Sequence, residues 1–282
     1  MGDLTTRWEP PRDGRILAHR LREDQPKPAI TPRRMERPVT CLVVMPTYNE
    51  AANLERIAPA LLSRTDYALL VVDDNSPDGT GDLAELLGRR FDGRVSVLHR
   101  PGKLGLGTAY VAGFRAALRA EPDFIVQMDA DFSHDPADVP RLIAACDRAD
   151  VAIGSRYVPG GGAENWPFSR WLISRGGSLY TQLILGLPVR DPTSGFKCFR
   201  RQALAAIDLG QIQASGFGFQ VEMNWQCHRH GLRMREVPIR FVDRQVGQSK
   251  MSRQIFFEAL WLVWRLRLGV PRQPRSTGIT AS

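Results

Sequence analysis

The feature that most constrains the fold is a regular alternation of apolar, strand-length runs with segments of helical periodicity between residues 39 and 157. The strand-length runs read TCLVVMP, ALLVVDD, VSVLHR, DFIVQMDAD and ADVAIGSRY. They lack polar alternation, which indicates that both faces of the sheet are covered. The pattern predicts an α/β fold, with a mostly parallel sheet flanked by helices.

Polar residues gather directly after these strands. The groups are Pro46–Glu50, Asp73–Asp74, His99–Arg100, Asp129–Asp131 and Ser155–Arg156. In open sheets of parallel strands, ligands bind outside the carboxyl ends of the strands. We therefore expect a binding site along one edge of the sheet.

The stretch VQMDADFSHDP places two carboxylates at the end of an apolar run. In an extended chain, Asp129 and Asp131 face the same side and can share one divalent cation. Mg²⁺ suits this arrangement, because it is held by one or two carboxylates together with phosphate oxygens. A turn capped by Ser133 or Asp135 is the alternative, but such a cap leaves the two preceding acids unexplained.

Other candidate motifs are less specific. On turn chemistry alone, Asp73–Asp74 followed by NSPDGT favours a strand-to-helix turn over a carboxylate that binds a base or ribose. The segment GKLGLGT is rich in glycine and precedes a helix, but its lysine stands at the wrong end for a Walker A loop. The N-terminus of the helix in MPTYNEAANL offers backbone N–H groups to a phosphate.

The alternation weakens after Tyr157. We expect one or two helices in FSRWLISRGGSLYTQLILGL, a loop and short strand in VRDPTSGFKCFRR, and a strand or hairpin in LRMREVPIRFVDR. Residues 1–38 are predicted to be a flexible or peripheral extension and residues 271–282 a flexible tail. The apolar helix predicted over 251–270 is interpreted either as an interfacial helix or as a core or partner-facing helix.

The formal net charge of +8 suits phosphate-rich partners, namely nucleotides, nucleic acid or an anionic membrane. Acids at the strand ends disfavour nucleic acid, because they would repel its backbone. The four cysteines form no CxxC pair, which argues against a zinc ribbon. We expect neither a signal peptide nor a transmembrane helix.

Seven ordered blocks between Val39 and Lys250 resemble the inverting glycosyltransferases of family 2, and most closely the dolichol- or polyprenol-phosphate mannose synthases. These blocks are VVMPTYNEAANL, VVDDNSPDGT, KLGLGTAY, MDADFSHDP, GSRYVPGG, DPTSGFKCFRR and VPIRFVDRQVGQSK. The resemblance implies a nucleotide-binding catalytic domain of GT-A type over residues 39–250. It implies transfer of mannose from GDP-mannose to polyprenyl phosphate with inversion, aided by Mg²⁺ or Mn²⁺. A related enzyme using UDP-glucose or another nucleotide sugar is the alternative.

The resemblance also implies roles for individual residues. The positions that match donor-binding residues are Pro46, Tyr48, Glu50, Val72, Asp74, Asp129, Ala130, Asp131, Arg156, Arg244 and Lys250. Those that match metal ligands are Asp129 and Asp131, and those that match acceptor-phosphate residues are Arg156, Arg170 and Ser174. Catalytic roles are implied for Asp131, Arg156, Arg244 and Lys250. The expected location is peripheral, on the cytoplasmic face of a membrane, and the chain's expected partners include the membrane surface and an integral membrane protein.

Overall fold

The computed structural model describes residues 41–63, 67–214, 216, 218–243 and 253–269, and the side chains of 253–259 are not described. Every described residue belongs to one compact unit. The predicted extension (1–38) and tail (271–282) lie outside the described residues. The same is true of two candidate site residues, Arg244 and Lys250.

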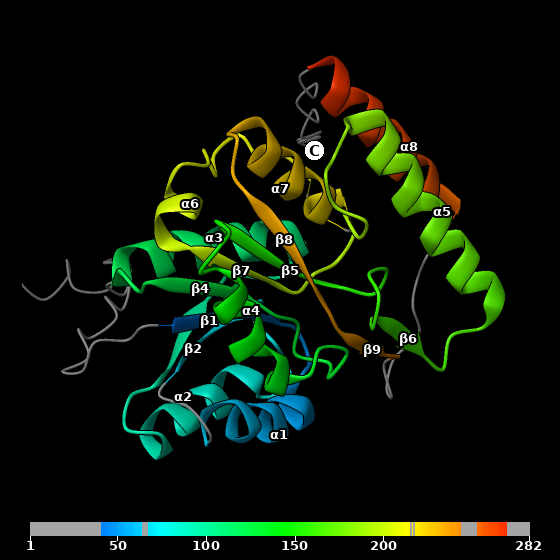
Figure 1. The fold of residues 1–282 in the computed structure, drawn as a ribbon. Helices are drawn as coiled ribbons and strands as arrows, with labels where there is room; N and C mark the ends of the chain where they lie inside the picture. The colour runs from blue at the N-terminus through cyan, green and yellow to red at the C-terminus, as the bar shows by residue number, and fades with distance from the viewer. Residues whose placement is uncertain (1–40, 64–66, 215, 217, 244–252, 270–282) are drawn as a thin grey trace, which may run out of the picture. The chain divides into compact units, whose positions relative to one another are not determined.

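A seven-stranded sheet forms the centre of the described unit, in the order β3-β2-β1-β4-β7-β5-β8 (Figure 1). Its strands are β1 (Cys41–Thr47), β2 (Ala68–Asp73), β3 (Val95–His99), β4 (Phe124–Gln127), β5 (Val151–Ser155), β7 (Lys197–Arg200) and β8 (Met234–Pro238). All neighbouring strands are parallel except at β7, which runs antiparallel to both β4 and β5. The prediction of an α/β fold with a mostly parallel sheet is therefore confirmed.

Helices cover both faces of this sheet. They are α1 (Ala51–Leu62), α2 (Thr80–Arg90), α3 (Leu106–Ala120), α4 (Val139–Ala145), α5 (Phe168–Leu185), α6 (Arg201–Ala205), α7 (Gly218–Arg229) and α8 (Arg253–Leu268), with a short 3-10 helix η1 (Pro136–Asp138) before α4. Successive residues of β1 belong to different apolar clusters, because side chains alternate across a strand. Val43 packs with α1, α2 and α4, whereas Val44 packs with α3, α6 and α7.

This two-sided burial explains why the strands read as continuous apolar runs, since every residue of β2 is buried.

Helix α3 approaches the sheet closely at Gly113. A Cβ atom there would lie 2.4 Å from Val44 Cγ1 and 2.9 Å from Val72 Cγ2. A glycine at this point therefore sets the distance between α3 and the sheet.

The second half of the chain resolves the alternatives that the sequence left open. FSRWLISRGGSLYTQLILGL forms the single helix α5. The segment LRMREVPIRFVDR is not a hairpin, because β8 pairs in parallel with β5, whereas β9 (Arg240–Val242) pairs in parallel with β6 (Gly162–Glu164) in a separate sheet. Helix α8 packs against α5 and α7 (Figure 1). Within the described residues, no helix has the length and apolar character needed to cross a membrane.

Candidate active site

The strand order changes direction between β1 and β4, and most of the candidate residues lie at this point. The chain runs from β1 outward to β2 and β3, and then returns to place β4 on the other side of β1. Such a reversal opens a crevice at the carboxyl ends of the strands. Tyr48 and Glu50 follow β1, Asp74 follows β2, and Asp129 to Asp131 follow β4. Pro46 and Val72 lie within the strands, opposite each other in the parallel register.

Asp129 and Asp131, the two acids of the DAD motif (residues 129–131), lie beyond the strand that leads to them. The sequence predicted a strand through Asp131, but β4 ends at Gln127. Its last cross-strand partner is Lys197, and the chain before Lys197 leaves the ladder. Phe132 then adopts a positive φ of 59°, which turns the chain. The shared face of Asp129 and Asp131 thus does not follow from strand periodicity, and their positions come from a turn after the strand.

Buried groups hold each acid of this turn. Tyr110 of α3 donates a hydrogen bond to Asp129 Oδ1 at 2.6 Å, and Ser133 donates to Asp131 Oδ1 through both N and Oγ, at 3.0 and 2.5 Å. Burial raises the pKa of Tyr110 well above its usual value, and the charge of Asp129 adds to this effect. Tyr110 therefore remains a neutral phenol that can donate at any working pH.

His134 packs against the same turn. Its Nδ1 accepts a hydrogen bond from the backbone N–H of Asp129 at 3.4 Å, and its ring stacks on Phe196 at 4.9 Å. Burial lowers the pKa of His134, although Asp129 and Asp131 act in the opposite direction. The imidazole is therefore neutral here, as its accepting Nδ1 requires, and it contributes shape rather than charge.

The donor set fits a hard divalent cation. The turn offers carboxylate oxygens from Asp129 and Asp131, and carboxylates are preferred ligands of Mg²⁺ and Mn²⁺. Among the residues that the structure describes, no group of three or more His, Cys, Asp and Glu side chains is arranged to hold a metal. The fit is thus to an ion that two carboxylates share with the phosphate oxygens of a substrate.

The helix-cap interpretations are partly correct. Asp135 caps η1 by accepting a hydrogen bond from Ala137 N at 2.8 Å, whereas Ser133 is engaged with Asp131. On the neighbouring strand, Asp73 accepts hydrogen bonds from Ser76 N and Oγ and from Thr47 Oγ1. This is the strand-to-helix turn that the sequence favoured for the first of the two acids.

Asp74, in contrast, forms an ion pair. Its carboxylate lies 2.7 Å from Arg100 Nη1, and both side chains are almost fully buried. Burial raises the pKa of Asp74, although the charge of Arg100 acts in the opposite direction. Arg100 is fixed in turn by a hydrogen bond from its Nη2 to Thr108 Oγ1 at 2.7 Å. The Asp74 carboxylate is thereby held at the carboxyl edge of β2.

Tyr48 provides an exposed aromatic face on the same edge. It is 36% exposed, and Lys103 Nζ lies 4.1 Å from the centre of its ring. Glu50, two residues on, accepts a hydrogen bond from Asn53 Nδ2 at 2.7 Å, and its backbone N–H donates to Thr80 Oγ1 at 3.0 Å. An aromatic face beside a cation and fixed carboxylates is chemically suited to a nucleoside.

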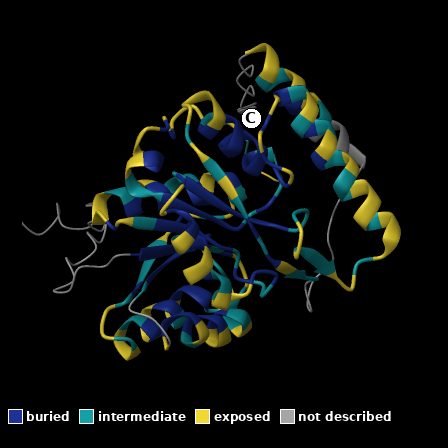
Figure 2. Ribbon diagram, in the orientation of Figure 1, coloured by how far each residue is buried: buried dark blue, intermediate teal, exposed yellow. Residues whose placement is uncertain are grey.

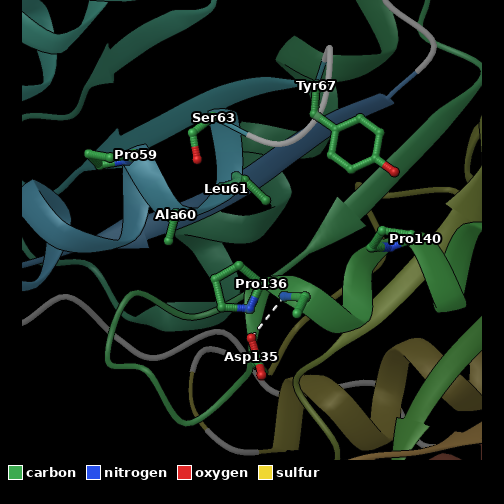
Figure 3. A pocket seen from close by; sticks show the side chains of 9 residues that line it. Pro59, Ala60, Leu61, Ser63, Tyr67, Asp135, Pro136 and Pro140 are labelled. Carbon is green, nitrogen blue, oxygen red and sulfur yellow. Dashed lines mark hydrogen bonds between the residues drawn. The ribbon is translucent and has the colours of Figure 1, made fainter.

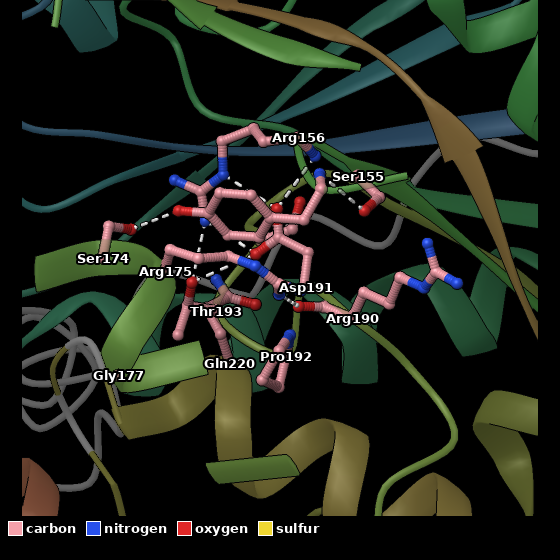
Figure 4. A network of polar contacts seen from close by, with 12 residues as sticks. Ser155, Arg156, Ser174, Arg175, Gly177, Arg190, Asp191, Pro192, Thr193 and Gln220 are labelled. Atoms are coloured by element: carbon pink, nitrogen blue, oxygen red, sulfur yellow. Dashed lines mark hydrogen bonds and ion pairs between the residues drawn. The ribbon is translucent and has the colours of Figure 1, made fainter. Parts of the chain in front are cut away.

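Arg156 follows β5 and is tied to Asp191 (Figure 4). Its Nε donates to Asp191 Oδ2 at 2.8 Å, and its Nη2 donates to Asp191 Oδ1 and to Thr193 Oγ1, both at 2.7 Å. Burial by itself would raise the pKa of Asp191, but the charge of Arg156 and its hydrogen bonds lower it. Arg156 is therefore a rigid, charged guanidinium rather than a mobile surface arginine.

The acceptor-phosphate candidates on α5 lie near this pair. Tyr157 donates a hydrogen bond to Ser174 Oγ at 2.7 Å, so that the Ser174 hydroxyl proton is available to another acceptor. A dashed line in Figure 4 joins Ser174 to the network that contains Arg156. Arg170 forms an ion pair with Asp243, and its guanidinium lies 4.5 Å from the centre of the Trp166 ring. The structure thus brings Arg156 and Ser174 into one network and holds Arg170 beside the Trp166 ring.

A buried lysine lies beneath the DAD turn. Lys197 is fully buried, and its Nζ donates to Ser194 O and, at 2.6 Å, to Gln220 Oε1. Gln127, the last residue of β4, donates to the same Gln220 oxygen at 2.7 Å. Burial lowers the pKa of Lys197 to about 7. This network joins β4, β7 and α7 under the candidate metal site.

A set of exposed apolar residues lies along α5 and α8. We call it the α5/α8 surface, and its exposed residues are Phe168, Trp171, Leu172, Ile173, Leu179, Leu183, Trp261, Trp264 and Leu268. Figure 2 shows the exposed residues along both helices. The helices are also joined by a hydrogen bond from Tyr180 Oη to Leu260 O at 3.2 Å. In α8, Leu262 and Val263 are buried, so that this helix is both packed and partly exposed.

A hollow of about 540 Å³ lies elsewhere, between the end of α1 and the start of α4 (Figure 3). Its lining residues are Pro59, Ala60, Leu61, Ser63, Tyr67, Asp135, Pro136, Ala137 and Pro140. None of them is a candidate site residue, and the Asp135 carboxylate is already engaged as a helix cap.

Sequence reasoning assigned no role to several residues that shape the site, namely Tyr110, Lys197, Asp191 and Thr193. All four stand in the conspicuous blocks KLGLGTAY and DPTSGFKCFRR. Their positions in those blocks were the available signal, but their partners lie 19 and 35 residues away for Tyr110 and Asp191. Only the folded chain reveals these contacts.

Comparison with known proteins agrees with this fold. The sequence profile described as "Glycosyl transferase family 2" matches residues 42–208. A solved structure of glucosyl-3-phosphoglycerate synthase from Mycobacterium tuberculosis, in complex with Mn²⁺, uridine diphosphate and phosphoglyceric acid, is similar with a TM-score of 0.59 and 21% identity, covering 83% of this chain and 80% of that chain. At this identity, the likeness concerns the fold.

Three curated relatives are similar in sequence. They are an undecaprenyl-phosphate mannosyltransferase from Micrococcus luteus (50% identity, 79% of this chain and 92% of the relative), a polyprenol monophosphomannose synthase from Mycolicibacterium smegmatis (44%, 80% and 87%), and a dolichol-phosphate mannosyltransferase from Pyrococcus furiosus (38%, 79% and 62%). The fold and the family profile together define the class of protein, a glycosyltransferase with a GT-A fold. Within that class, the chain belongs to glycosyl transferase family 2.

Proposed function

We propose that this protein transfers mannose from GDP-mannose to a polyprenyl phosphate, with inversion, giving polyprenyl phosphate β-mannose and GDP. The observation that carries the proposal is the identity of 38–50% to three relatives, each named for mannosyl transfer to such a phosphate or for synthesis of its product. The carboxyl-edge site supports it, because its features suit a nucleotide, a metal-bound diphosphate and a phosphate acceptor.

The nucleotide would lie against the edge formed by β1 and β2. The exposed face of Tyr48 suits stacking by a base. Asp74, fixed by Arg100, offers carboxylate oxygens to N–H or O–H donors of the base or ribose. Backbone at Pro46, Val72 and Ala130 would line this part of the site, since the last two side chains are buried.

Asp129 and Asp131 would hold a Mg²⁺ or Mn²⁺ ion. When bound, such an ion stabilises the negative charge that develops on a departing diphosphate. The task of the protein is to position the two acids. Tyr110 orients Asp129 and Ser133 orients Asp131, so that both carboxylates are preorganised.

The acceptor needs no general base from the protein. A phosphate monoester has a second pKa of about 6 and is largely dianionic near neutral pH. Its oxygen can attack the anomeric carbon directly, while the bond to the nucleoside diphosphate breaks on the opposite face. Arg156, Arg170 and Ser174 would bind the acceptor phosphate and align it. Arg244 and Lys250, outside the described residues, would supply further positive charge.

We also propose that the α5/α8 surface rests on the lipid bilayer that holds the acceptor, on its cytoplasmic face. Ser174 and Arg170 lie on α5 itself, so that lipid contact through this helix would place the acceptor-phosphate residues beside lipid headgroups. Trp171, Trp261 and Trp264 suit the membrane interface, where tryptophan side chains are favoured. An integral membrane protein is proposed as a further partner at the same membrane.

Lipid contact is tested by co-sedimentation with vesicles of phosphatidylcholine and phosphatidylglycerol. The double variant Leu183→Ser/Trp264→Ser should bind vesicles several-fold more weakly than the wild type. Leu86→Ser on α2 removes an exposed leucine from a helix outside the α5/α8 surface and serves as the control. Equal vesicle binding by the double variant and the wild type would contradict the bilayer proposal without affecting the transfer reaction.

The transfer reaction is tested by incubating the protein with labelled GDP-mannose, polyprenyl phosphate and Mg²⁺ or Mn²⁺, and measuring label in the organic phase. Label should appear there and should disappear with a chelator. Asp131→Asn should abolish transfer. Asp138→Asn, which removes the carboxylate of η1 that pairs with Arg141 of α4, is the control and should leave transfer intact. An excess of unlabelled UDP-glucose tests the alternative donor. Absence of label in the organic phase with all components present would refute the proposal.

A further inference from the structure

We propose that Asp191 is a positioning residue that fixes Arg156 so that a single edge of its guanidinium, at Nη1, is presented to the reacting phosphates. This inference rests on the proposed function for the identity of those phosphates. The arrangement of the pair itself can be tested separately.

The hydrogen bonds of Arg156 leave one nitrogen for a ligand. A guanidinium has five N–H donors in a fixed plane, one on Nε and two on each Nη. Nε donates to Asp191, and Nη2 donates to Asp191 and to Thr193. Within the described part of the chain, Nη1 makes no hydrogen bond. Both of its donors can therefore serve an oxygen of a phosphate or sugar.

Aromatic rings surround the same guanidinium. The rings of Tyr157, Trp166 and Phe241 have their centres 5.3, 5.4 and 5.3 Å from Arg156 Cζ. Cation–π contacts of this kind hold an arginine against aromatic rings. The side chain is only 9% exposed. Arg156 thus has little freedom to swing toward a ligand, and its orientation is set before any ligand binds.

Asp191 acts through Arg156 rather than on a ligand. Its side chain is fully inaccessible to solvent, and its carboxylate also accepts a hydrogen bond from the backbone N–H of Arg156 at 3.0 Å. Its own backbone N–H donates to Glu236 Oε1 at 2.9 Å, which anchors the segment from β8. Asp191 is therefore fixed by the fold and in turn fixes Arg156.

The opposite charges of Asp191 and Arg156 limit what the pair can contribute to binding and catalysis. The carboxylate of Asp191 neutralises much of the charge of Arg156, so that the pair contributes direction more than net positive charge. Misplacement of a reacting group by about 1 Å can reduce a rate by about 100-fold. Loss of Asp191 should therefore affect kcat far more than the KM for the nucleotide sugar.

The test is a double-mutant cycle. Asp191→Asn keeps the side-chain shape but turns an amide NH₂ toward the guanidinium donors, and kcat should fall about 100-fold with less than a threefold change in KM. Arg156→Lys should lower kcat similarly, and the double variant Asp191→Asn/Arg156→Lys should be no worse than Arg156→Lys alone. Glu236→Gln perturbs the same loop without touching Arg156 and should retain kcat within about threefold.

Multiplicative loss in the double variant, or normal kcat in a folded Asp191→Asn protein, would overturn the inference. If Asp191→Asn does not fold, Thr193→Val removes only the second acceptor of Nη2. It should lower kcat by about threefold to tenfold. Unchanged kcat in this variant would then count against a fixed guanidinium.

A spectroscopic measurement separates this inference from the proposed function. In protein labelled with ¹⁵N-arginine, Arg156 Nε–H should give a slowly exchanging signal, identified by its disappearance in Arg156→Lys. The signal should survive in Glu236→Gln and be lost in Asp191→Asn. A wild-type protein without such a signal would overturn the positioning role even if mannose transfer is active. A protected signal in an enzyme without transfer activity would instead refute only the proposed reaction.

Discussion

The hydrogen bond from Tyr110 to Asp129 makes a quantitative prediction about metal affinity. Tyr110 is fully buried on α3, and its ring stacks on Phe219 with centres 5.5 Å apart and planes 3° apart. Substitution with phenylalanine preserves this packing and removes only the hydroxyl. Asp129 Oδ1 then loses its 2.6 Å donor in a site walled by aromatic rings.

The expected loss of metal affinity in Tyr110→Phe follows from the kind of hydrogen bond that is removed. A hydrogen bond to a charged group contributes about 1.5–3 kcal/mol. Groups that orient metal ligands typically change metal affinity by about 10- to 100-fold, which corresponds to roughly 1.4–2.7 kcal/mol. Both routes give the same range, so Tyr110→Phe should weaken Mn²⁺ binding by about 10- to 100-fold. Excess metal should restore most of kcat, because the carboxylate itself remains.

The assay is a Mn²⁺ titration in the presence of GDP, following the electron paramagnetic resonance signal of the free ion. Tyr180→Phe is the matched control, since its hydroxyl bonds to Leu260 O between α5 and α8. That variant should bind Mn²⁺ as the wild type does. A folded Tyr110→Phe protein with unchanged Mn²⁺ affinity would refute the reasoning that links α3 to the metal site.

Other predictions concern stability and nucleotide binding. Because burial lowers the pKa of Lys197 from 10.5 to about 7, the unfolded chain binds a proton there between these values that the folded chain does not. The free energy of unfolding should therefore rise by about 3 kcal/mol between pH 7 and 9.5 because of this group. In urea unfolding experiments at several pH values, Lys197→Met should lack this part of the pH dependence. Gly113→Ala should destabilise the fold by about 1–3 kcal/mol in thermal unfolding, because its new methyl group would overlap side chains of β1 and β2. Gly177→Ala on α5, where a Cβ meets nothing within 4 Å, should be neutral or slightly stabilising. Lys103→Ala should weaken GDP binding about twofold to fivefold in calorimetry, since it removes the cation from the Tyr48 ring; unchanged affinity would show that this contact does not order the ring.

The fold and the edge of the sheet were predictable, because they depend on local pattern. Continuous apolar runs such as ALLVVDD require cover on both faces, and β2 is buried at every position. The chain direction then places the ends of β1, β2, β4 and β5 along one edge. Resemblance to a family added residue roles that periodicity could not supply.

The prediction failed, or left alternatives open, where strand pairing rather than local pattern set the structure. DFIVQMDAD has the pattern of one strand through Asp131, but β4 ends at Gln127, where its antiparallel partner β7 begins at Lys197. The pattern of LRMREVPIRFVDR also allowed a hairpin, whereas its two strands pair with different partners. Neither choice is visible without the neighbouring strand.

By itself, the sequence determined the α/β alternation, the edge that carries the acids, and the positive net charge that suits phosphate-rich partners. The first two depend on residues close together in sequence, through periodicity or through the end of a strand. Only the tertiary structure decided what each acid and arginine contacts: Tyr110 at Asp129, Arg100 at Asp74, and Asp191 at Arg156. These contacts join residues that are distant in sequence, and each is fixed by burial in a packed interior, where a polar group must find a partner.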